Sequence, residues 1–287
     1  MASNEAEFHP PMKPLSVIAS IAALFFLAAS SPTLAQESKK PDPWLITVTR
    51  THSSGAELSR VAAPMVLAMG QSYRQILTLN MATKSEPRFW RINFHIDLSG
   101  PKPALGFEAG SLEILQTTYG EGNRRSTDPV PLFASMLPWK GAGTYPLFSL
   151  DGEAVTATFR PDTTETLDGP VHKPEQILEI IRKDRLGRIA SKASCPWAKV
   201  EAGRRAADLA LWAETPSTRR IRWFSCSSAE SNGFLTITAK DFSSFGDPVT
   251  VFVSDALLGA PTRMQVYRLD DEVVEARIGP GGAPAAE

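Results

Sequence analysis

The sequence predicts a β-rich α+β protein, with mainly antiparallel strands and one insert of two helices. Short segments in which polar and apolar residues alternate recur in the first half of the chain and again near its end, and a period of two is typical of half-buried strands. Tight-turn residues join several of these segments, which favours antiparallel hairpins. Between them, residues 174–213 carry the start signals and apolar spacing of helices.

The chain opens with the parts of a cleavable export signal. Residues 17–29 are apolar except for Ser20, and residues 33–35 place small side chains at the −3 and −1 positions before Gln36. A membrane span needs about 20 apolar residues, so this stretch is short for the alternative, a retained membrane anchor. We expect residues 1–35 to be removed, which leaves no stable membrane span.

The first eleven residues fit an export signal less well than those that follow. They include Glu5 and Glu7 and no Lys or Arg, whereas Lys13 directly follows Met12. A positively charged start is typical of signal peptides. We therefore expect translation to begin at Met12 rather than Met1, and a mass spectrum that contains peptides from the first eleven residues would refute this.

Export places the mature chain in the periplasm or outside the cell, where thiols oxidise. The chain has two cysteines, Cys195 and Cys226. An even pair in an oxidising compartment favours a disulfide over free thiols or a metal site. Closing a loop of this length would stabilise the fold by about 3–4 kcal/mol in the chain-entropy model.

The first expected region, residues 37–170, is β-rich. Four of its segments predict strands: Trp44–Arg50, Tyr73–Met81, Phe89–Leu98 and Leu112–Thr118. Residues 56–69 are ambiguous, because Pro64 would break or kink an otherwise helix-compatible run. Residues 119–144 are rich in Gly, Pro and Arg and predict a loop. The Asp-Gly pair at residues 151–152 then predicts a hairpin with a type I′ turn.

The second expected region, residues 171–280, begins with the helical insert. Pro174 and Glu175 suit a first helical turn. The apolar residues of this first helix share a stripe: Ile177, Ile180, Ile181 and Ile189. A second helix is expected over Glu201–Ala213, where four residues fall roughly in line: Ala202, Ala206, Leu209 and Trp212.

A meander of strands completes this region. The expected strands are Arg220–Ser227, Phe234–Lys240, Pro248–Ser254, Met264–Leu269 and Glu272–Ile278. Residues 281–287, rich in Gly, Pro and Ala, predict a disordered tail. No internal repeat at a fixed period is evident, and one continuous core is the alternative to two regions.

The charge balance argues against nucleic acid as a partner. The chain holds 30 Lys and Arg residues against 31 Asp and Glu residues, and a near-neutral chain has no global field that would steer it to an anionic polymer. Residues 171–222 are locally basic and residues 223–287 locally acidic, and the two segments could face each other in one domain. A basic face toward envelope phosphates or an acidic partner is the alternative.

His95 and Asp97 are weak candidates for a catalytic pair. They lie two residues apart on the polar side of one expected strand, so both project from the same face. The acid could orient the imidazole for base catalysis if a serine or a water lay nearby. No G-x-S-x-G nucleophile motif accompanies the pair. The preferred interpretation is the solvated side of a half-buried strand.

Binding motifs are equally sparse. The sequence has no H-x-H, H-E-x-x-H or paired-cysteine spacing and no Gly-rich phosphate loop, so we expect no metal and no cofactor. Arg124 and Arg125, on a Gly-containing loop, are weak candidates for anion binding. Trp139, also in a loop, is the weak candidate for an exposed ligand-binding aromatic residue. Anchoring of its own loop is the simpler alternative.

These observations favour an exported, periplasmic or secreted protein that acts as a non-catalytic binding or interaction module of the envelope. Its partner would be an unidentified envelope protein or ligand. The alternative, from a different class, is a hydrolase that uses His95 and Asp97. The sequence leaves open whether the chain is an enzyme, with the binding role preferred.

Overall fold

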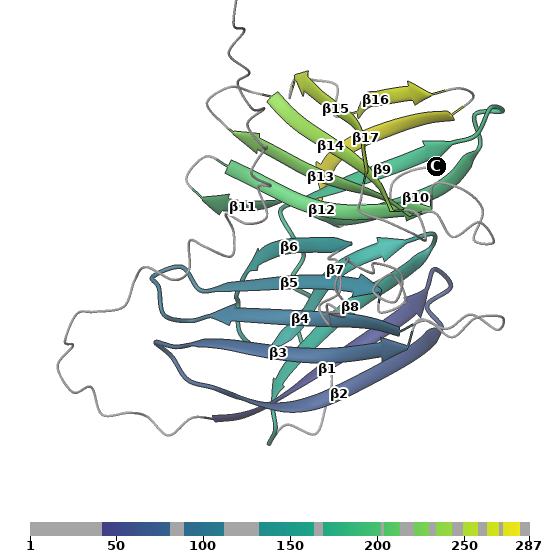
Figure 1. Cartoon of the computed structure of the whole chain (residues 1–287). Helices are drawn as coiled ribbons and strands as arrows, with labels where there is room; N and C mark the ends of the chain where they lie inside the picture. The colour runs from purple at the N-terminus through teal and green to yellow at the C-terminus, as the bar shows by residue number, and fades with distance from the viewer. Residues whose placement is uncertain are drawn as a thin grey trace, which may run out of the picture. The chain divides into compact units, whose positions relative to one another are not determined.

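Every described element of the computed structural model is a β-strand, and the named strands pair antiparallel in two sheets (Figure 1). The structure describes residues 42–80, 89–111, 132–163, 169–201, 204–212, 221–229, 234–242, 249–257, 263–269 and 272–281. All of these lie in the unit Lys40–Glu287. No helix in these ranges is long and apolar enough to cross a membrane.

The two sheets differ in strand number but share a common plan. Sheet A has eight strands, in the spatial order β16 (Arg263–Leu269), β17 (Glu272–Pro280), β9 (Gln176–Lys183), β10 (Ile189–Pro196), β7 (Gly143–Leu150), β8 (Glu153–Pro161), β1 (Asp42–His52) and β2 (Glu57–Leu67). Sheet B has nine, in the order β15 (Val249–Leu257), β14 (Phe234–Phe242), β13 (Ile221–Ala229), β12 (Arg204–Trp212), β6 (Phe133–Pro138), β5 (Ala104–Ser111), β4 (Phe89–Asp97) and β3 (Ser72–Asn80), with β11 (Ala198–Glu201) paired to β12 off this path.

The core lies between the two sheets and is built from alternate residues of their strands. Trp90 of β4 stacks on Phe148 of β7, with ring centroids 5.4 Å apart. Phe94 meets Phe159 of β8 edge-on at 6.0 Å. The odd-numbered neighbours on β4, including His95 and Asp97, are only half-buried, because they lie on the opposite face of sheet B.

The predicted α+β class is wrong for the described part of the chain, because both expected helices are strands. The first is replaced by the hairpin of β9 and β10. Ile180 and Ile181 are buried on opposite faces of β9. A strand with two buried faces loses the alternation that identifies it, and its apolar run then resembles a helical stripe.

The second expected helix, Glu201–Ala213, overlaps the end of β11 and all of β12. Its alanines favour a helix, but pairing with β13 and burial on both faces override this weak preference. Leu209 and Ala210 point to opposite faces of β12, and both are buried. Trp212, expected on a helical stripe, belongs to the same strand.

The other local expectations have mixed outcomes. The type I′ hairpin is confirmed, because Asp151 and Gly152 have φ values of 48° and 83°. The expected loop over residues 119–144 is wrong at β6, which pairs with β5. The expected strand Leu112–Thr118 and the tail beyond Gly281 lie outside the described residues.

The eight strands β1–β8 and the eight strands β9, β10 and β12–β17 have the same topology. In the first half, sheet A has the order β7-β8-β1-β2 and sheet B the order β6-β5-β4-β3. In the second half, the orders are β16-β17-β9-β10 and β15-β14-β13-β12. Taken in chain order, β1–β8 therefore correspond one by one to β9, β10 and β12–β17. Strand β11 has no counterpart in the first half. The chain is an internal duplication.

The registers of the two halves agree as closely as their topologies. Arg50 lies opposite Ser59 and Val155, and Arg182 lies opposite Ser191 and Val274. The bulge of β7 between Pro146 and Phe148 recurs in β16 between Gln265 and Tyr267. Equivalent positions can therefore be assigned residue by residue.

Identical residues occupy many of these equivalent positions. In the first two strands of each half they are Arg50 and Arg182, Gly55 and Gly187, Ser59 and Ser191, and Pro64 and Pro196. In the last three strands and their turns they are Phe133 and Phe252, Ser135 and Ser254, Leu150 and Leu269, Asp151 and Asp270, Glu153 and Glu272, Val155 and Val274, Ala157 and Ala276, and Pro161 and Pro280.

The sequence shows no repeat at a fixed period, and the structure gives the reason. The identities are isolated, and the connection after β5 (residues 112–132) is much longer than the one after β14 (residues 243–248), so no single period relates the halves. The division into residues 37–170 and 171–280 stays a prediction. Its boundary falls between β8 and β9, and both sheets run continuously across it.

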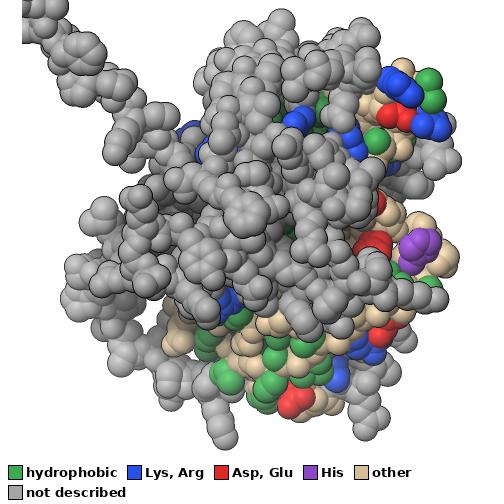
Figure 2. Space-filling model, turned by 45° about the vertical axis from the view of Figure 1, so that its right-hand side comes forward, with side chains coloured by type: hydrophobic (Ala, Val, Ile, Leu, Met, Phe, Trp, Pro, Cys, Tyr) green, Lys and Arg blue, Asp and Glu red, His purple; other side chains and the backbone are tan. Residues whose placement is uncertain are grey.

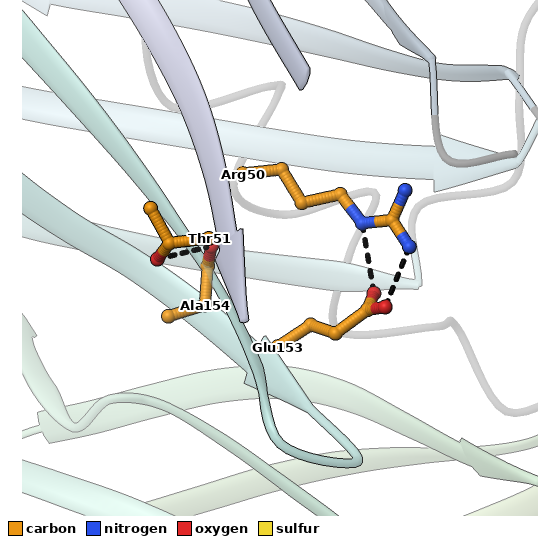
Figure 3. Close-up of polar contacts among 4 residues, drawn as sticks. All are labelled: Arg50, Thr51, Glu153 and Ala154. Atoms are coloured by element: carbon orange, nitrogen blue, oxygen red, sulfur yellow. Dashed lines mark hydrogen bonds and ion pairs between the residues drawn. The ribbon is translucent and has the colours of Figure 1, made fainter. Parts of the chain in front are cut away.

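One buried ion pair illustrates the equivalence. Arg50, whose side chain is 5% exposed, donates from Nε and Nη2 to the two carboxylate oxygens of Glu153 at 2.8 and 2.6 Å (Figure 3). Arg182, its counterpart on β9, is also buried. A guanidinium inside a sandwich is stable only when its charge and hydrogen bonds are satisfied. An arginine at both positions therefore indicates that each half has to satisfy a buried positive charge at this point of the sheet.

Candidate functional site

The structure places His95 and Asp97 together on the outer face of sheet B, the face turned away from sheet A. Asp97 Oδ1 accepts hydrogen bonds from the amide of Ser99 and the hydroxyl of Ser72, both at 2.9 Å, and from the hydroxyl of Ser99. Burial alone would raise the pKa of Asp97, but these bonds hold it below its usual value. Asp97 thus stays ionised and secures the turn that follows β4.

His95 is the group of this pair that could exchange a proton. Burial, and then the positive charge of Arg74, lower its pKa, while Asp97 and Glu108 act in the opposite direction. A neutral imidazole can act as a base. In a Ser-His-acid triad, however, the serine donates to the imidazole. The serines that bind Asp97 donate to the carboxylate instead, so this group of residues lacks the order of a triad.

Asp208 of β12 is a buried carboxyl on the same face that the sequence analysis missed. Burial raises its pKa to about 7; a hydrogen bond from Ser225 and the charge of Lys240 oppose this, whereas the charge of Glu108 adds to it. Cross-strand pairing places it in a row with Ile76, Asn93, Glu108, Ala134 and Ser225. A lone Asp inside the run Ala-Ala-Asp-Leu-Ala was its only signal, and a helix was expected there.

Chemically, this row brings a carboxyl that titrates near neutral pH into the field of a second carboxylate. Such pairs occur at acid–base sites, and they also occur in buried structural networks. Asp208 is only 8% exposed, so a substrate would reach it poorly. We therefore assign Asp208 a structural role.

Trp139, the candidate ligand-binding residue, directly follows β6, and its amide donates to the Pro103 carbonyl at 2.9 Å. Its ring is parallel to that of Tyr145 at 5.6 Å and contacts Phe159 edge-on at 5.0 Å. The half-exposed Trp44 follows at 6.0 Å. Tyr145 also binds the loop after Trp139, because its hydroxyl accepts from the Lys140 amide and donates to the Gly141 carbonyl. These contacts support loop anchoring for Trp139.

Two further candidate groups have different outcomes. Arg124 and Arg125 lie outside the described residues. In the ranges that the structure covers, no group of three or more His, Cys, Asp or Glu side chains is arranged to hold a metal ion.

Cys195 of β10 and Cys226 of β13 lie in the core of the second half, and the structure has both as free thiols. Burial, and then the proximity of the two groups and of Asp208, raise the pKa of Cys195 far above its usual value. Cys226 shares the effects of burial and of Asp208. Neither thiol is therefore a nucleophile in its reduced form. Cys195 belongs to sheet A and Cys226 to sheet B.

A set of polar contacts joins the two halves, and we call this junction the seam. It consists of the pairs β7–β10 and β6–β12. Asp151 is central to it: its amide donates to the Lys192 carbonyl, and its carboxylate accepts from the Lys192 amide, both at 2.8 Å. The Ser191 hydroxyl adds a third bond to Asp151 at 3.0 Å. The Ser135 hydroxyl donates to the Pro196 carbonyl at 2.6 Å.

The strands that end the two sheets in the first half, β2 and β3, expose apolar side chains. Their exposed fractions are 44% for Leu58, 49% for Val66, 77% for Met69 and 50% for Ile76. In the space-filling view, hydrophobic side chains gather at the level where Figure 1 draws these strands (Figure 2). We call β2, β3 and their connection the head edge. The strands at the opposite limits of the sheets, β15 and β16, form the tail edge.

No protein-family model matches the chain, and neither a curated protein nor a solved structure matches it.

Proposed function

We propose that this protein is an exported, non-catalytic interaction module of the cell envelope, located in the periplasm or secreted. The exposed apolar side chains of the head edge carry the proposal. A sheet edge presents unpaired backbone groups, and apolar residues beside them favour association with another protein. Leu58 and Val66 of β2 and Ile76 of β3 combine both features.

The export signal and the cysteine pair support the location. Residues 17–35 have the composition of a cleavable leader. Two buried thiols from opposite sheets would form a disulfide across the core once the chain reached an oxidising compartment. We propose Cys195–Cys226 as this disulfide.

Photo-crosslinking in intact cells tests the interaction role. A photoreactive amino acid in place of Val66 should yield an adduct of defined mass. The same amino acid in place of Leu186, an exposed apolar residue of the β9–β10 turn, should not yield it. The same cells, separated into compartments, should contain the processed chain outside the cytoplasm. Adducts of equal yield at both positions, or none at any head-edge residue, would remove the basis of the proposal.

A hydrolase that uses His95 and Asp97 remains the second candidate, favoured only by their shared face and by the lowered pKa of His95. Turnover of generic ester or peptide substrates by the purified protein would support it if His95→Gln abolished the activity. Loss of turnover in His95→Gln with an unchanged melting temperature would separate catalysis from folding. Unchanged turnover in this variant would exclude His95.

A further inference from the structure

We propose that the head edge of one molecule binds the tail edge of a second copy, in the way that β10 and β12 bind β7 and β6 at the seam. The inference names the partner of the interaction module proposed above and rests on that function. It follows from the duplication, because each edge of the chain is equivalent to one side of a junction that the chain already makes.

The topology supplies the two surfaces. Strands β2 and β3 are the counterparts of β10 and β12, which form one side of the seam. Strands β16 and β15 are the counterparts of β7 and β6, which form the other side. Within one chain, these two edges lie at opposite limits of the sheets and cannot meet. A second copy provides the missing half of each junction.

The residues that make the polar contacts of the seam recur at the edges. Asp151, which accepts from Ser191 and Lys192, corresponds in the sequence to Asp270, which lies outside the described residues. Ser191 and Lys192 have Ser59 and Arg60 as counterparts on β2.

A second contact of the seam recurs in the same way. Ser135, which donates to Pro196, corresponds to Ser254 on β15, and Pro196 corresponds to Pro64 on β2. Both residues of this second contact thus recur on strands at opposite edges of the chain, Ser254 on β15 and Pro64 on β2. A copy-to-copy junction with the register of the seam would place Val61 opposite Leu269 of the second copy.

The apolar residues agree with the same register. At the seam, Asp208 of β12 lies opposite Ala134 of β6. The counterparts are Ile76 on β3 and Val253 on β15. Ile76 is half exposed, so a partner valine would remove apolar area from water without burying a carboxyl.

Proline does not prevent this pairing. A proline on an edge strand normally discourages the addition of another strand. Pro196 occupies the position of Pro64 on β10, and β10 nevertheless pairs with β7 through Ala193 and Ser194. The counterparts of these residues on β2 are Val61 and Ala62, which precede Pro64.

Such a contact joins two different surfaces and is therefore heterologous. Each added copy leaves one head edge and one tail edge, so the assembly grows beyond a dimer unless rotation closes it into a ring. Assembly size should then rise with protein concentration.

Sedimentation velocity of the purified chain, as the expressing cell processes it, tests the inference. The unaltered protein should sediment as species larger than a monomer, in proportions that depend on concentration. Ile76→Lys should weaken association at least about tenfold, because it buries a charge at the junction. Leu186→Lys, a matched change of an exposed apolar residue, should leave association unchanged. Ile76 is exposed, and circular dichroism should show a native fold for both variants.

A mixing experiment tests the direction of the contact. Val253→Lys changes β15 at the position equivalent to Ala134, which lies opposite Asp208 at the seam. Alone, this variant should also associate about tenfold more weakly, because it introduces a charge at the junction. Mixed in equal amounts, Ile76→Lys and Val253→Lys retain one intact tail edge and one intact head edge. They should form a dimer that does not grow further.

Three outcomes would overturn the inference. They are a monomer at every concentration, a dimer that only the head-edge variant disrupts, and variants that do not complement each other on mixing. A monomer that still gives a specific Val66 adduct to a different protein in cells would leave the interaction role intact. A monomer without such an adduct would count against both.

Discussion

The two halves of the chain share their strand order and registers but fill their cores differently. The first half packs Trp90, Phe94 and Phe107 between its sheets. The equivalent positions of the second half hold Arg222, Cys226 and Ile237. The residues that the halves share include a few core positions, such as those of Phe133 and Val155, and positions at the turns and the buried ion pair. The comparison indicates that backbone geometry fixes this topology, whereas the volume of individual core side chains can vary.

The largest expected effect concerns the smaller core of the second half. A disulfide between Cys195 and Cys226 should raise the free energy of unfolding by about 3–4 kcal/mol in the chain-entropy model. Urea unfolding with and without reductant measures this difference, and Cys226→Ser should abolish it. Intact mass under non-reducing conditions that shows two free thiols would disprove the disulfide.

The buried arginine tests whether the halves are energetically equivalent. Arg50→Met should lower the free energy of unfolding by about 3 kcal/mol, because it leaves the Glu153 carboxylate without its partner in a largely buried site. Arg182→Met should lower the free energy of unfolding by a similar amount if the buried arginine of the second half is paired in the same way. A double variant, Arg50→Met with Glu153→Gln, should cost less than the sum of the single changes. Additive costs would argue against coupling of the pair.

Asp208 is a difference between the halves, since Ile76 occupies the equivalent position. Its raised pKa favours the protonated form in the folded state, so stability is fully present below pH 4 and decreases as pH rises toward 7. Asp208→Asn should remove this loss and stabilise the protein by about 2 kcal/mol at pH 8. Unfolding curves between pH 4 and pH 8 measure it. A variant with the same pH dependence as the unaltered protein would contradict the assignment.

The smallest expected effect lies in the paired turns. Gly55 and Gly187 have φ values of 82° and 76°, and each amide donates to the carbonyl three residues earlier, at 2.8 and 2.9 Å. An added Cβ meets no atom within 4 Å at either site. Gly55→Ala and Gly187→Ala should each cost about 1 kcal/mol through backbone strain alone. Chemical denaturation should show equal costs, and unequal ones would mean that the turns are not equivalent.

Part of this fold could be predicted from the sequence, and the remainder could not for identifiable reasons. The alternation in β4 and the Asp-Gly turn after Leu150 are local signals, and both predictions were confirmed. β9 and β12 were misassigned because both of their faces are buried, which erases the period of two. Asp208 was missed for the same reason. The duplication depends on long-range registers, which a single sequence does not display.

The pairing of the first strand of each half with its last strand governs how the chain can be shortened. β17, at residues 272–280, lies inside sheet A between β16 and β9 rather than at its border. Removing β17 would separate β16 from the sheet and leave the backbone of β9 unpaired along the edge that β17 now covers. Truncation before residue 272 should therefore produce a protease-sensitive, aggregating protein, while removal of residues 282–287 should be harmless. During synthesis, when the amino terminus emerges first, the second half can close only after almost the whole polypeptide has been made.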